Sequence, residues 1–513
     1  MTTAPPRQTV VLMTDATRWD MLGCYRDTGL ATPHLDGLAA SGTRFERAYT
    51  AQPVCAPARA ALFTGTWPHS NGTWSNNLAP GLDVPTLGQR LRDRGVPAAY
   101  IGKWHLDGTD YFGNGRCPDG WDPEYWYDMR TYLQELTPEE RRASRDPGTA
   151  QDPGVEEAFT YAYRCTQRAR DFLADHEGED FLLVVSYDEP HDPGLTPPEF
   201  AARHRAYAFP DDGNVRDPLD GKPAHQRTWA SDRLAEDRSA YERRAPAYFA
   251  AQEFVDGQIG RVLAAVEAHA PGALVAYTSD HGDMLGSHRL WAKGPAMYDE
   301  IARVPLLVRL PGTTEPGSVA PHPVSHIDLA PTVLTHLGLD VPDLLPGRPL
   351  QPVLAEPSAR TSDAVFTEFG RYEVDHDGFG GFQPMRGVFD GRHKLVVNLL
   401  SDDELYDLAE DPGELVNLIA DPAHAAPRDA LHDRLLAWMN ETRDPFRGVY
   451  WERRPWRTDA REATWEYDGM TRARPDDPGY QPRVLDYATG LEATEPVRRK
   501  EAPVTPPAAP AAP

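Results

Sequence analysis

Features that are scarce or absent narrow the class of protein before any motif is considered. The 513 residues include only four cysteines, Cys24, Cys55, Cys117 and Cys165, which are too few for a disulfide-stabilised scaffold. No stretch approaches the ~18 consecutive apolar residues of a membrane-spanning helix, so we expect no membrane association. Positive charge is in deficit, with 52 Lys and Arg against 78 Asp and Glu. The resulting net charge of −26 repels phosphate, so we expect no nucleic-acid partner.

The N-terminal residues also lack the basic segment, apolar core and small-residue cleavage site of a secretory signal peptide. A strand-like apolar run begins already at Thr9. Together with thiols that we expect to be reduced, this predicts a cytoplasmic protein. The content of 40% apolar and 25% charged residues is ordinary for a globular chain of two or three domains.

Four apolar runs, residues 9–14, 98–102, 181–187 and 273–279, each end abruptly in polar residues. They are short, and several are rich in β-branched residues, as is typical of strands buried on both faces of a parallel sheet. Helical patterns at 85–94, 156–176 and 247–269 precede the last three runs, and a capping box at 325–328 opens another helix. This alternation predicts an α/β fold with a large, mainly parallel sheet flanked by helices.

Polar residues directly follow the four predicted strands: Asp15, Lys103, His105, His191, Asp280 and His281. Ligands of open α/β sheets bind outside the carboxyl ends of the strands. We therefore expect these six side chains to converge on one site.

The pattern of predicted strands and helices changes after about residue 372. Residues 393–400 and 402–408 resemble strands, and 430–440 has helical spacing. We predict a catalytic domain at 1–372 and a smaller C-terminal α+β domain at 373–490. Residues 491–513, rich in Pro and Ala, are expected to form a disordered tail.

The most specific motif is Cys55-Ala56-Pro57-Ala58-Arg59. Pro57 suits the first position of a helix, which would put Cys55 just before a helix N-terminus, where an anion is favoured. Cys-x-Pro-x-Arg resembles the signature of the type I sulfatases of the alkaline phosphatase superfamily. The resemblance covers most of the chain and extends to segments 15–24, 32–36, 102–105, 190–193, 279–283, 405–408 and 411–414, and to Lys293 in the matching loop.

The resemblance implies an alkaline-phosphatase-like fold and a nucleophile made after synthesis. In this family a maturation enzyme oxidises the cysteine, here Cys55, to formylglycine, whose aldehyde hydrate attacks sulfur. The family roles then fall on matching residues: Arg59 holds the formylglycine hydroxyls, Lys103 and Lys293 hold sulfate oxygens, His105 takes the second hydroxyl proton, and His191 protonates the leaving alcohol. Histidine suits both proton transfers because its pKa lies near the working pH.

The metal site departs from the family pattern at one position. Asp15, Asp280 and His281, with the modified Cys55, are the expected ligands of one divalent ion that activates the attacking hydroxyl. The family usually carries a second acid directly after the first, where this chain has Ala16. A site short of oxygen and containing imidazole favours Mn²⁺ or a similar ion, with Ca²⁺ as the alternative.

The organic part of the substrate is less sharply specified. The aromatic segment from Tyr111 to Tyr132 could stack on sugar rings or simply pack on the domain. The glycine-rich residues 376–382 could line the pocket. We favour a carbohydrate sulfate or another sulfated small molecule as substrate. The rivals are a phosphonate monoester or phosphodiester hydrolase of the same superfamily and a non-catalytic relative that binds sulfated sugar.

Overall fold

The computed structural model describes residues 5–108, 110–146, 148–149, 155–211, 213–231, 235–457, 460 and 488–490. Its main sheet contains four neighbouring parallel strands, in the order β3 (Ala98–Gly102), β4 (Phe181–Pro190), β1 (Gln8–Asp15) and β5 (Leu274–Ser279), with β3 at the edge. These are the four strands that the apolar runs predict. Their parallel pairing confirms the predicted fold class.

The sheet continues beyond β5 with mixed pairing. Strand β6 (Arg303–Arg309) is antiparallel to β5, and β2 (Thr43–Tyr49) is antiparallel to β6. The short strands β7 (Ser318–Ala320) and β8 (Val324–Ser325) both pair in parallel with β2. All eight strands belong to one sheet.

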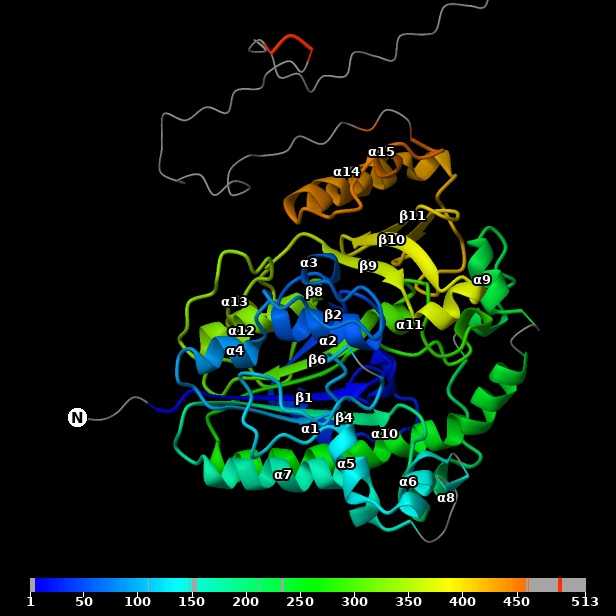
Figure 1. Ribbon diagram of the computed structural model, residues 1–513. Coiled ribbons are helices and arrows are strands. Elements are labelled where there is room, and N and C mark those ends of the chain that lie inside the picture. The colour runs from blue at the N-terminus through cyan, green and yellow to red at the C-terminus, as the bar shows by residue number, and fades with distance from the viewer. Residues whose placement is uncertain are drawn as a thin grey trace, which may run out of the picture. The chain divides into compact units, whose positions relative to one another are not determined.

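Helices cover both faces of this sheet (Figure 1). Alternate residues of β1 show why: Val10 and Leu12 face one core, whereas Val11 and Met13 face the other. The first core is closed by α1 (Pro33–Ser41), α5 (Met129–Glu135), α7 (Tyr161–Asp175) and α10 (Ala235–His269). The second is closed by α2 (Cys55–Thr64), α4 (Leu87–Arg92), α12 (Leu329–His336) and α13 (Gln351–Ala355).

Local signals define several helix ends. Thr86 and Gln89 form a capping box at the start of α4, and the Thr160 hydroxyl accepts from the N–H of Tyr163 to cap α7. The predicted capping box at Ser325 is present and opens a 3₁₀ turn that leads into α12.

The remaining helices of this region are α3 (Pro68–Asn71), α6 (Pro138–Arg145), α8 (Pro198–His204), α9 (Ala224–Trp229) and α11 (Asp299–Ala302). The 3₁₀ turns are η1 (Trp19–Met21), η3 (Glu157–Phe159), η4 (Asn214–Arg216), η6 (Ser287–Arg289), η7 (His326–Asp328), η8 (Val374–Phe379) and η9 (Pro422–His424).

A second, antiparallel sheet forms the smaller C-terminal part. Its strands are β9 (Val365–Arg371), β10 (Phe382–Phe389), β11 (His393–Asn398) and β12 (Glu404–Asp407), in the order β12-β11-β10-β9. The last two coincide with the strands predicted at 393–400 and 402–408. Helix α14 (Ala425–Glu441) contains the helix predicted at 430–440.

The chain divides into two compact units, residues 1–431 and residues 432–513. The second unit contains the end of α14 and the short helix α15 (Val449–Glu452), and His432 Nε2 bonds to the carbonyl of Trp451 at 2.7 Å. The domain bounds 1–372 and 373–490 stay a prediction. The tail predicted at 491–513 lies outside the described residues.

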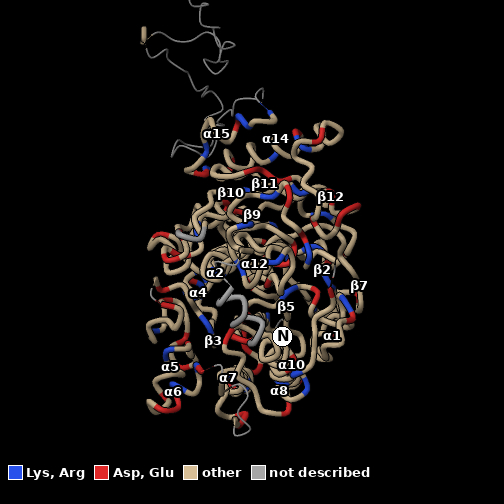
Figure 2. The backbone as a smooth tube through the Cα atoms, turned by 90° about the vertical axis from the view of Figure 1, so that its right-hand side faces the viewer, with Lys and Arg blue, Asp and Glu red and all other residues tan. Residues whose placement is uncertain are grey.

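The described helices include none with the length and apolarity needed to cross a bilayer. Stretches of Lys and Arg and stretches of Asp and Glu are interspersed over the described chain in the view of Figure 2. The local charge of the functional site therefore depends on which side chains fold together there.

Candidate active site

The carboxyl ends of the parallel strands carry the polar residues that the sequence singles out. In sheet order, Lys103 and His105 follow β3, His191 follows β4, Asp15 ends β1, and Asp280 and His281 follow β5. His191 is partly buried and the other five are buried. The structure brings all six together at one edge of the sheet.

Gly102 makes the close approach of β3 to β4 possible. Its φ of 117° lies in the region that favours glycine, and a Cβ at this position would lie 1.9 Å from the carbonyl oxygen of Ser186. The Lys103 N–H donates to that same carbonyl at 2.8 Å. This contact fixes where Lys103 leaves the strand.

Cys55 is the first residue of α2, with Val54 as its N-cap. The expectation that Pro57 begins the helix and that Cys55 precedes it was therefore wrong by two residues. Proline is tolerated at the third position because the first N–H groups of a helix have no intrahelical partner. Cys55 is 1% exposed, so its sulfur lies inside the protein.

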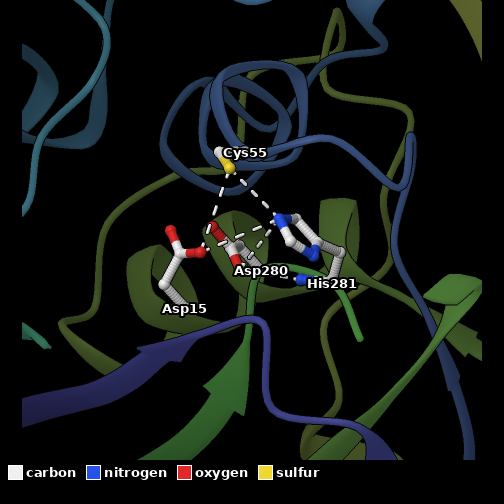
Figure 3. A group of neighbouring side chains, drawn as sticks. All are labelled: Asp15, Cys55, Asp280 and His281. Atoms are coloured by element: carbon white, nitrogen blue, oxygen red, sulfur yellow. Dashed lines mark hydrogen bonds and ion pairs between the residues drawn. The ribbon is translucent and has the colours of Figure 1, made fainter. Parts of the chain in front are cut away.

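Cys55 points from α2 toward Asp15, Asp280 and His281, which rise from the strand ends below it (Figure 3). One candidate ligand atom from each of these four buried residues lies within 4.8 Å of the others. Cys55 Sγ lies 3.1 Å from His281 Nε2 and 3.9 Å from Asp15 Oδ1. His281 Nδ1 lies 2.8 Å from the carbonyl of Gly282, which can only accept, so Nδ1 donates there and Nε2 is the ring nitrogen that faces the group. This donor set fits one divalent metal ion.

Arg59 ties this group to the sheet. Its Nη2 donates to Asp15 Oδ2 and its Nε to Asp280 Oδ2, each at 2.9 Å. Its Nη1 donates to the carbonyl of Lys103 and to Ser186 Oγ, both at 2.7 Å. One buried guanidinium from α2 thereby contacts the ends of β1, β3 and β5 and a residue within β4.

Two lysines add positive charge. Lys103 Nζ lies 2.7 Å from Asp15 Oδ2 and 3.2 Å from Asp188 Oδ1. Burial alone would raise the pKa of Asp15, but the adjacent cations Lys103 and Arg59 hold that pKa well below its usual value. Asp15 therefore stays ionised. Lys293 Nζ lies 3.0 Å from His191 Nε2, which brings the second lysine and the second histidine together.

Both predicted proton-transfer histidines are held in the neutral form. Burial lowers the pKa of His105 to about 3, assisted by Lys103 and Arg59. Burial also lowers the pKa of His191 well below its usual value, assisted by Lys293 and Lys103. A neutral His105 can accept a proton. His191 would have to gain one, and an anionic ester beside Lys293 would favour that gain.

The aromatic segment from Tyr111 to Tyr132 serves mainly as packing. The rings buried in the two cores beside the sheet are Trp121, Tyr125, Trp126, Tyr127 and Tyr132. The alternative in which these rings stack on a sugar is therefore wrong. Tyr111 differs, since its hydroxyl contacts Asp188 and lies 3.2 Å from His191 Nδ1.

Sequence reasoning did not assign site positions to Tyr111, Ser186 or Asp188. The polar Ser186 and Asp188 at the end of an otherwise apolar run were a signal that could have found two of them. Tyr111 carried no such signal, because it lies in a segment full of aromatic residues.

A groove with a mixed polar and apolar lining adjoins the nucleophile position. It has a volume of about 250 Å³ and is lined by residues 74–78, Arg371 and residues 373–375. Asn76 connects it to the site, because its Oδ1 accepts from the Ala56 N–H and its Nδ2 donates to Glu373 Oε1, each at 3.0 Å. The lining stops at Asp375, just short of the glycine-rich residues 376–382.

Comparison with known proteins decides the family. The sulfatase family model matches residues 7–339, about two thirds of the chain. An uncharacterised sulfatase of Escherichia coli, YidJ, is 45% identical over 489 residues, which cover 94% of this chain and 96% of the relative. The chain belongs to the sulfatase family. This sulfatase is accordingly a sulfuric ester hydrolase of the alkaline phosphatase superfamily, as its motifs indicated.

Three further matches extend the comparison. An N-acetylglucosamine-6-O-sulfatase of Bacteroides thetaiotaomicron is 25% identical, with 85% of this chain and 86% of the relative covered. The solved phosphonate monoester hydrolase of Agrobacterium radiobacter is 24% identical with a TM-score of 0.72, covering 86% of this chain and 96% of that one. Residues 286–441 of the sulfatase also match the C-terminal model of N-sulphoglucosamine sulphohydrolase.

Proposed function

We propose that this sulfatase hydrolyses carbohydrate sulfate esters, using a formylglycine made from Cys55 by a maturation enzyme and one divalent metal ion. The observation that carries the proposal is the buried group of Asp15, Cys55, Asp280 and His281. A formylglycine hydrate at position 55 would supply the nucleophilic oxygen, and a metal would lower the pKa of that hydroxyl.

The chain's own residues hold the substrate and move protons. Lys103 and Lys293 bind sulfate oxygens, and Arg59 holds the hydroxyls at position 55. His191 gives a proton to the ester oxygen as the alcohol leaves. His105, buried and neutral, takes the proton of the second hydroxyl so that sulfate is expelled.

The carbohydrate preference rests on the groove and on the amino-sugar sulfatase among the relatives. The groove offers Trp74 as a flat apolar surface and side chains such as Asn77, Glu373 and Asp375 as hydrogen-bond partners. Such a lining suits a sugar, because a sugar presents apolar ring faces and many hydroxyl groups.

The proposal extends to the metal and the compartment. Two carboxylates with one imidazole favour Mn²⁺ over Ca²⁺. A cytoplasmic location agrees with the four cysteines, all of which are free thiols in the structure. Activation of metal-stripped protein by each ion and fractionation of the source cells test these two points.

Two measurements test the central proposal. The mass of the peptide containing Cys55 reports whether the cysteine has become formylglycine. Cys55→Ser should be sulfated once and then stall, because a serine ester has no second hydroxyl through which to eliminate sulfate. Sustained turnover by Cys55→Ser would contradict the formylglycine mechanism.

The phosphonate monoester hydrolase with the same fold makes phosphodiester hydrolysis the second candidate. Turnover of nitrophenyl sulfate and of a nitrophenyl phosphodiester by the same protein separates the two. Faster turnover of the phosphodiester would favour this candidate. Binding of sulfated sugar without turnover of either ester, in metal-loaded protein with formylglycine present, would favour the non-catalytic relative.

A further inference from the structure

Tyr111 lies at the centre of the proposed proton-transfer groups although no catalytic motif includes it. Its ring centroid is 3.9 Å from Lys103 Nζ, 5.1 Å from the His191 ring and 5.7 Å from the His105 ring. Its hydroxyl donates a hydrogen bond to Asp188 Oδ1. A single side chain therefore contacts both histidines, one sulfate-binding lysine and a buried carboxylate.

The direction of these hydrogen bonds follows from the chemistry of the partners. Burial raises the pKa of Tyr111 well above its usual value, with a further contribution from Asp188, so the phenol keeps its proton. An ionised carboxylate can only accept, so the Tyr111 O–H donates to Asp188. The phenol oxygen then has lone pairs free to accept from His191 Nδ1, 3.2 Å away.

A second contact fixes the same tautomer of His191. The carbonyl of Asp192 lies 3.2 Å from His191 Nδ1 and can only accept. His191 Nδ1 therefore carries a proton, and Nε2 faces Lys293 at 3.0 Å. Nε2 is thus the nitrogen that points to the sulfate-binding groups.

Tyr111 is itself held from several sides. The guanidinium of Arg145 lies 5.5 Å from the centroid of its ring and 5.2 Å from that of Phe112. The Arg130 N–H donates to the carbonyl of Phe112 at 3.0 Å, which attaches this segment to α5. A phenol held in this way keeps its hydroxyl directed at Asp188 and His191.

We propose that Tyr111, anchored by Asp188, is a positioning residue that directs His191 Nε2 at the ester oxygen of the substrate. The proposal rests on the proposed function of His191 as the acid that protonates the leaving alcohol. In that step the bond between sulfur and the ester oxygen breaks, and its electron pair stays on the ester oxygen. That oxygen takes a proton from His191 Nε2, which must first have gained that proton from water, while sulfur becomes bonded to the nucleophilic oxygen at position 55, whose own hydroxyl proton passes to water. The negative charge of Asp188, reached through the phenol, favours the protonated His191 that this transfer requires.

The test uses two leaving groups. Tyr111→Phe keeps the ring beneath Lys103 and removes only the hydroxyl. We expect kcat for an alkyl or sugar sulfate to fall roughly 10- to 100-fold, a share of the 100- to 10,000-fold that a general acid supplies. Nitrophenyl sulfate, whose leaving group needs little protonation, should lose less than about threefold, and KM for both esters should change little.

The matched control is Tyr125→Phe. Tyr125 belongs to the same aromatic segment, and its hydroxyl donates to Asp175 Oδ2 at 2.8 Å, so this variant also loses one bond between a phenol and a carboxylate. It should leave the ratio of the two rates unchanged. In a His191→Ala background, Tyr111→Phe should cause no further loss with the alkyl ester.

The outcomes separate the hypotheses. Equal losses on both esters, no loss on either, or a further loss in the His191→Ala background would each overturn the positioning role. If wild type, with formylglycine and metal confirmed, turns over neither ester, the proposed function fails instead. If Tyr111→Phe does not fold, Asp188→Asn removes the anchor. The losses on the alkyl ester and on nitrophenyl sulfate are then compared for Asp188→Asn. The comparison uses kcat, because this variant also loses the contact between Asp188 and Lys103, and that loss affects mainly KM.

Discussion

His105 and His191 lie in one site, but their surroundings suit them to different steps. His105 has φ of 58°, and its two ring nitrogens have no hydrogen-bond partner within the part of the chain that the structure describes. His191 contacts Lys293 and Tyr111. A buried imidazole without partners is free to accept a proton, whereas a histidine between a lysine and a phenol is oriented to deliver one.

This difference predicts different kinetics for the two alanine variants. His105→Ala should release about one equivalent of nitrophenol in a burst and then slow by roughly 100-fold or more, because sulfate is no longer expelled. His191→Ala should show no burst, because His105 is intact in that variant and sulfate is still expelled at the normal rate. Rapid-mixing measurements with nitrophenyl sulfate check both. A burst of the same size in both variants would contradict these assignments.

Ala16 is a residue whose backbone serves the metal site. Its φ is 67°, it is 3% exposed, and its N–H donates to Asp280 Oδ1 at 3.1 Å. Its carbonyl accepts a hydrogen bond from Tyr248. The position where the family usually supplies a carboxylate therefore lies next to the predicted ligands. Aspartate and asparagine tolerate this left-handed conformation better than alanine does.

Ala16→Asp should therefore tighten Ca²⁺ binding, because Ca²⁺ gains affinity with each added carboxylate. The measurement is calcium titration of activity in metal-stripped wild type and variant. Ala16→Asn is the matched control, with a similar shape and no added charge, and should gain much less. A calcium response in folded Ala16→Asp no stronger than in wild type would show that position 16 does not reach the ion.

At the scale of elements, the close approach of β3 to β4 depends on a glycine. Gly102→Ala would place a methyl group 1.9 Å from the carbonyl oxygen of Ser186 at a φ that alanine avoids. We expect a loss of about 1–3 kcal/mol in the free energy of unfolding and a larger loss of activity, because Lys103 follows directly. Thermal unfolding and kcat/KM measure the two effects.

Gly257→Ala is the control for that variant. Gly257 lies within α10, and a Cβ there would meet nothing within 4 Å. Alanine stabilises a helix interior by up to about 1 kcal/mol relative to glycine, so this variant should be at least as stable as wild type. Equal stability of the two variants would show that Gly102 is not required for the strand approach.

The elements themselves were largely predictable from the sequence. The four parallel strands follow from apolar runs buried on both faces, and the strand-end rule led to the site. Helix α10 was expected from 247 but begins at Ala235 and continues through Pro246. A proline normally interrupts a helix, but tertiary packing can override this preference. Local sequence patterns do not report such packing, so they did not predict the longer helix.

The connections between elements were not predictable. Tyr111 is close to His191 only because the segment after β3 folds back over the end of β4. Arg59 was expected to hold the nucleophile, and nothing in its motif indicates its bond to Ser186. Periodicity indicates which face of an element is buried but does not identify the particular side chains that meet across elements.

At the scale of the whole molecule, the buried acid Glu189 makes the free energy of unfolding depend on pH. Burial raises the pKa of Glu189 to about 8, and Asp188 adds to the shift. Its Oε2 has no hydrogen-bond partner among the described residues. The unfolded chain releases this proton near its ordinary pKa of 4.5, whereas the folded protein keeps it up to about pH 8. Raising the pH between these values therefore favours the unfolded state.

Glu189→Gln should remove this pH-dependent loss, which corresponds to about 1.4 kcal/mol for each unit of pKa shift. We expect little change in melting temperature at pH 5 and a clear increase at pH 8. Glu199→Gln, at an exposed glutamate on α8, is the control and should behave like wild type at both pH values. The same increase at pH 5 as at pH 8 would contradict a raised pKa for Glu189.

The burial of Cys55 also bears on the order of events during biosynthesis. A side chain at the start of α2 that is 1% exposed cannot enter the active site of another enzyme once the surrounding sheet has formed. Under the proposed mechanism, the maturation enzyme therefore competes with folding. It can no longer reach Cys55 once Arg59 has formed its hydrogen bonds to Asp15, Asp280, Ser186 and the carbonyl of Lys103. Chains that fold first would remain permanently unconverted, so the active fraction of a preparation would record the relative speeds of folding and modification.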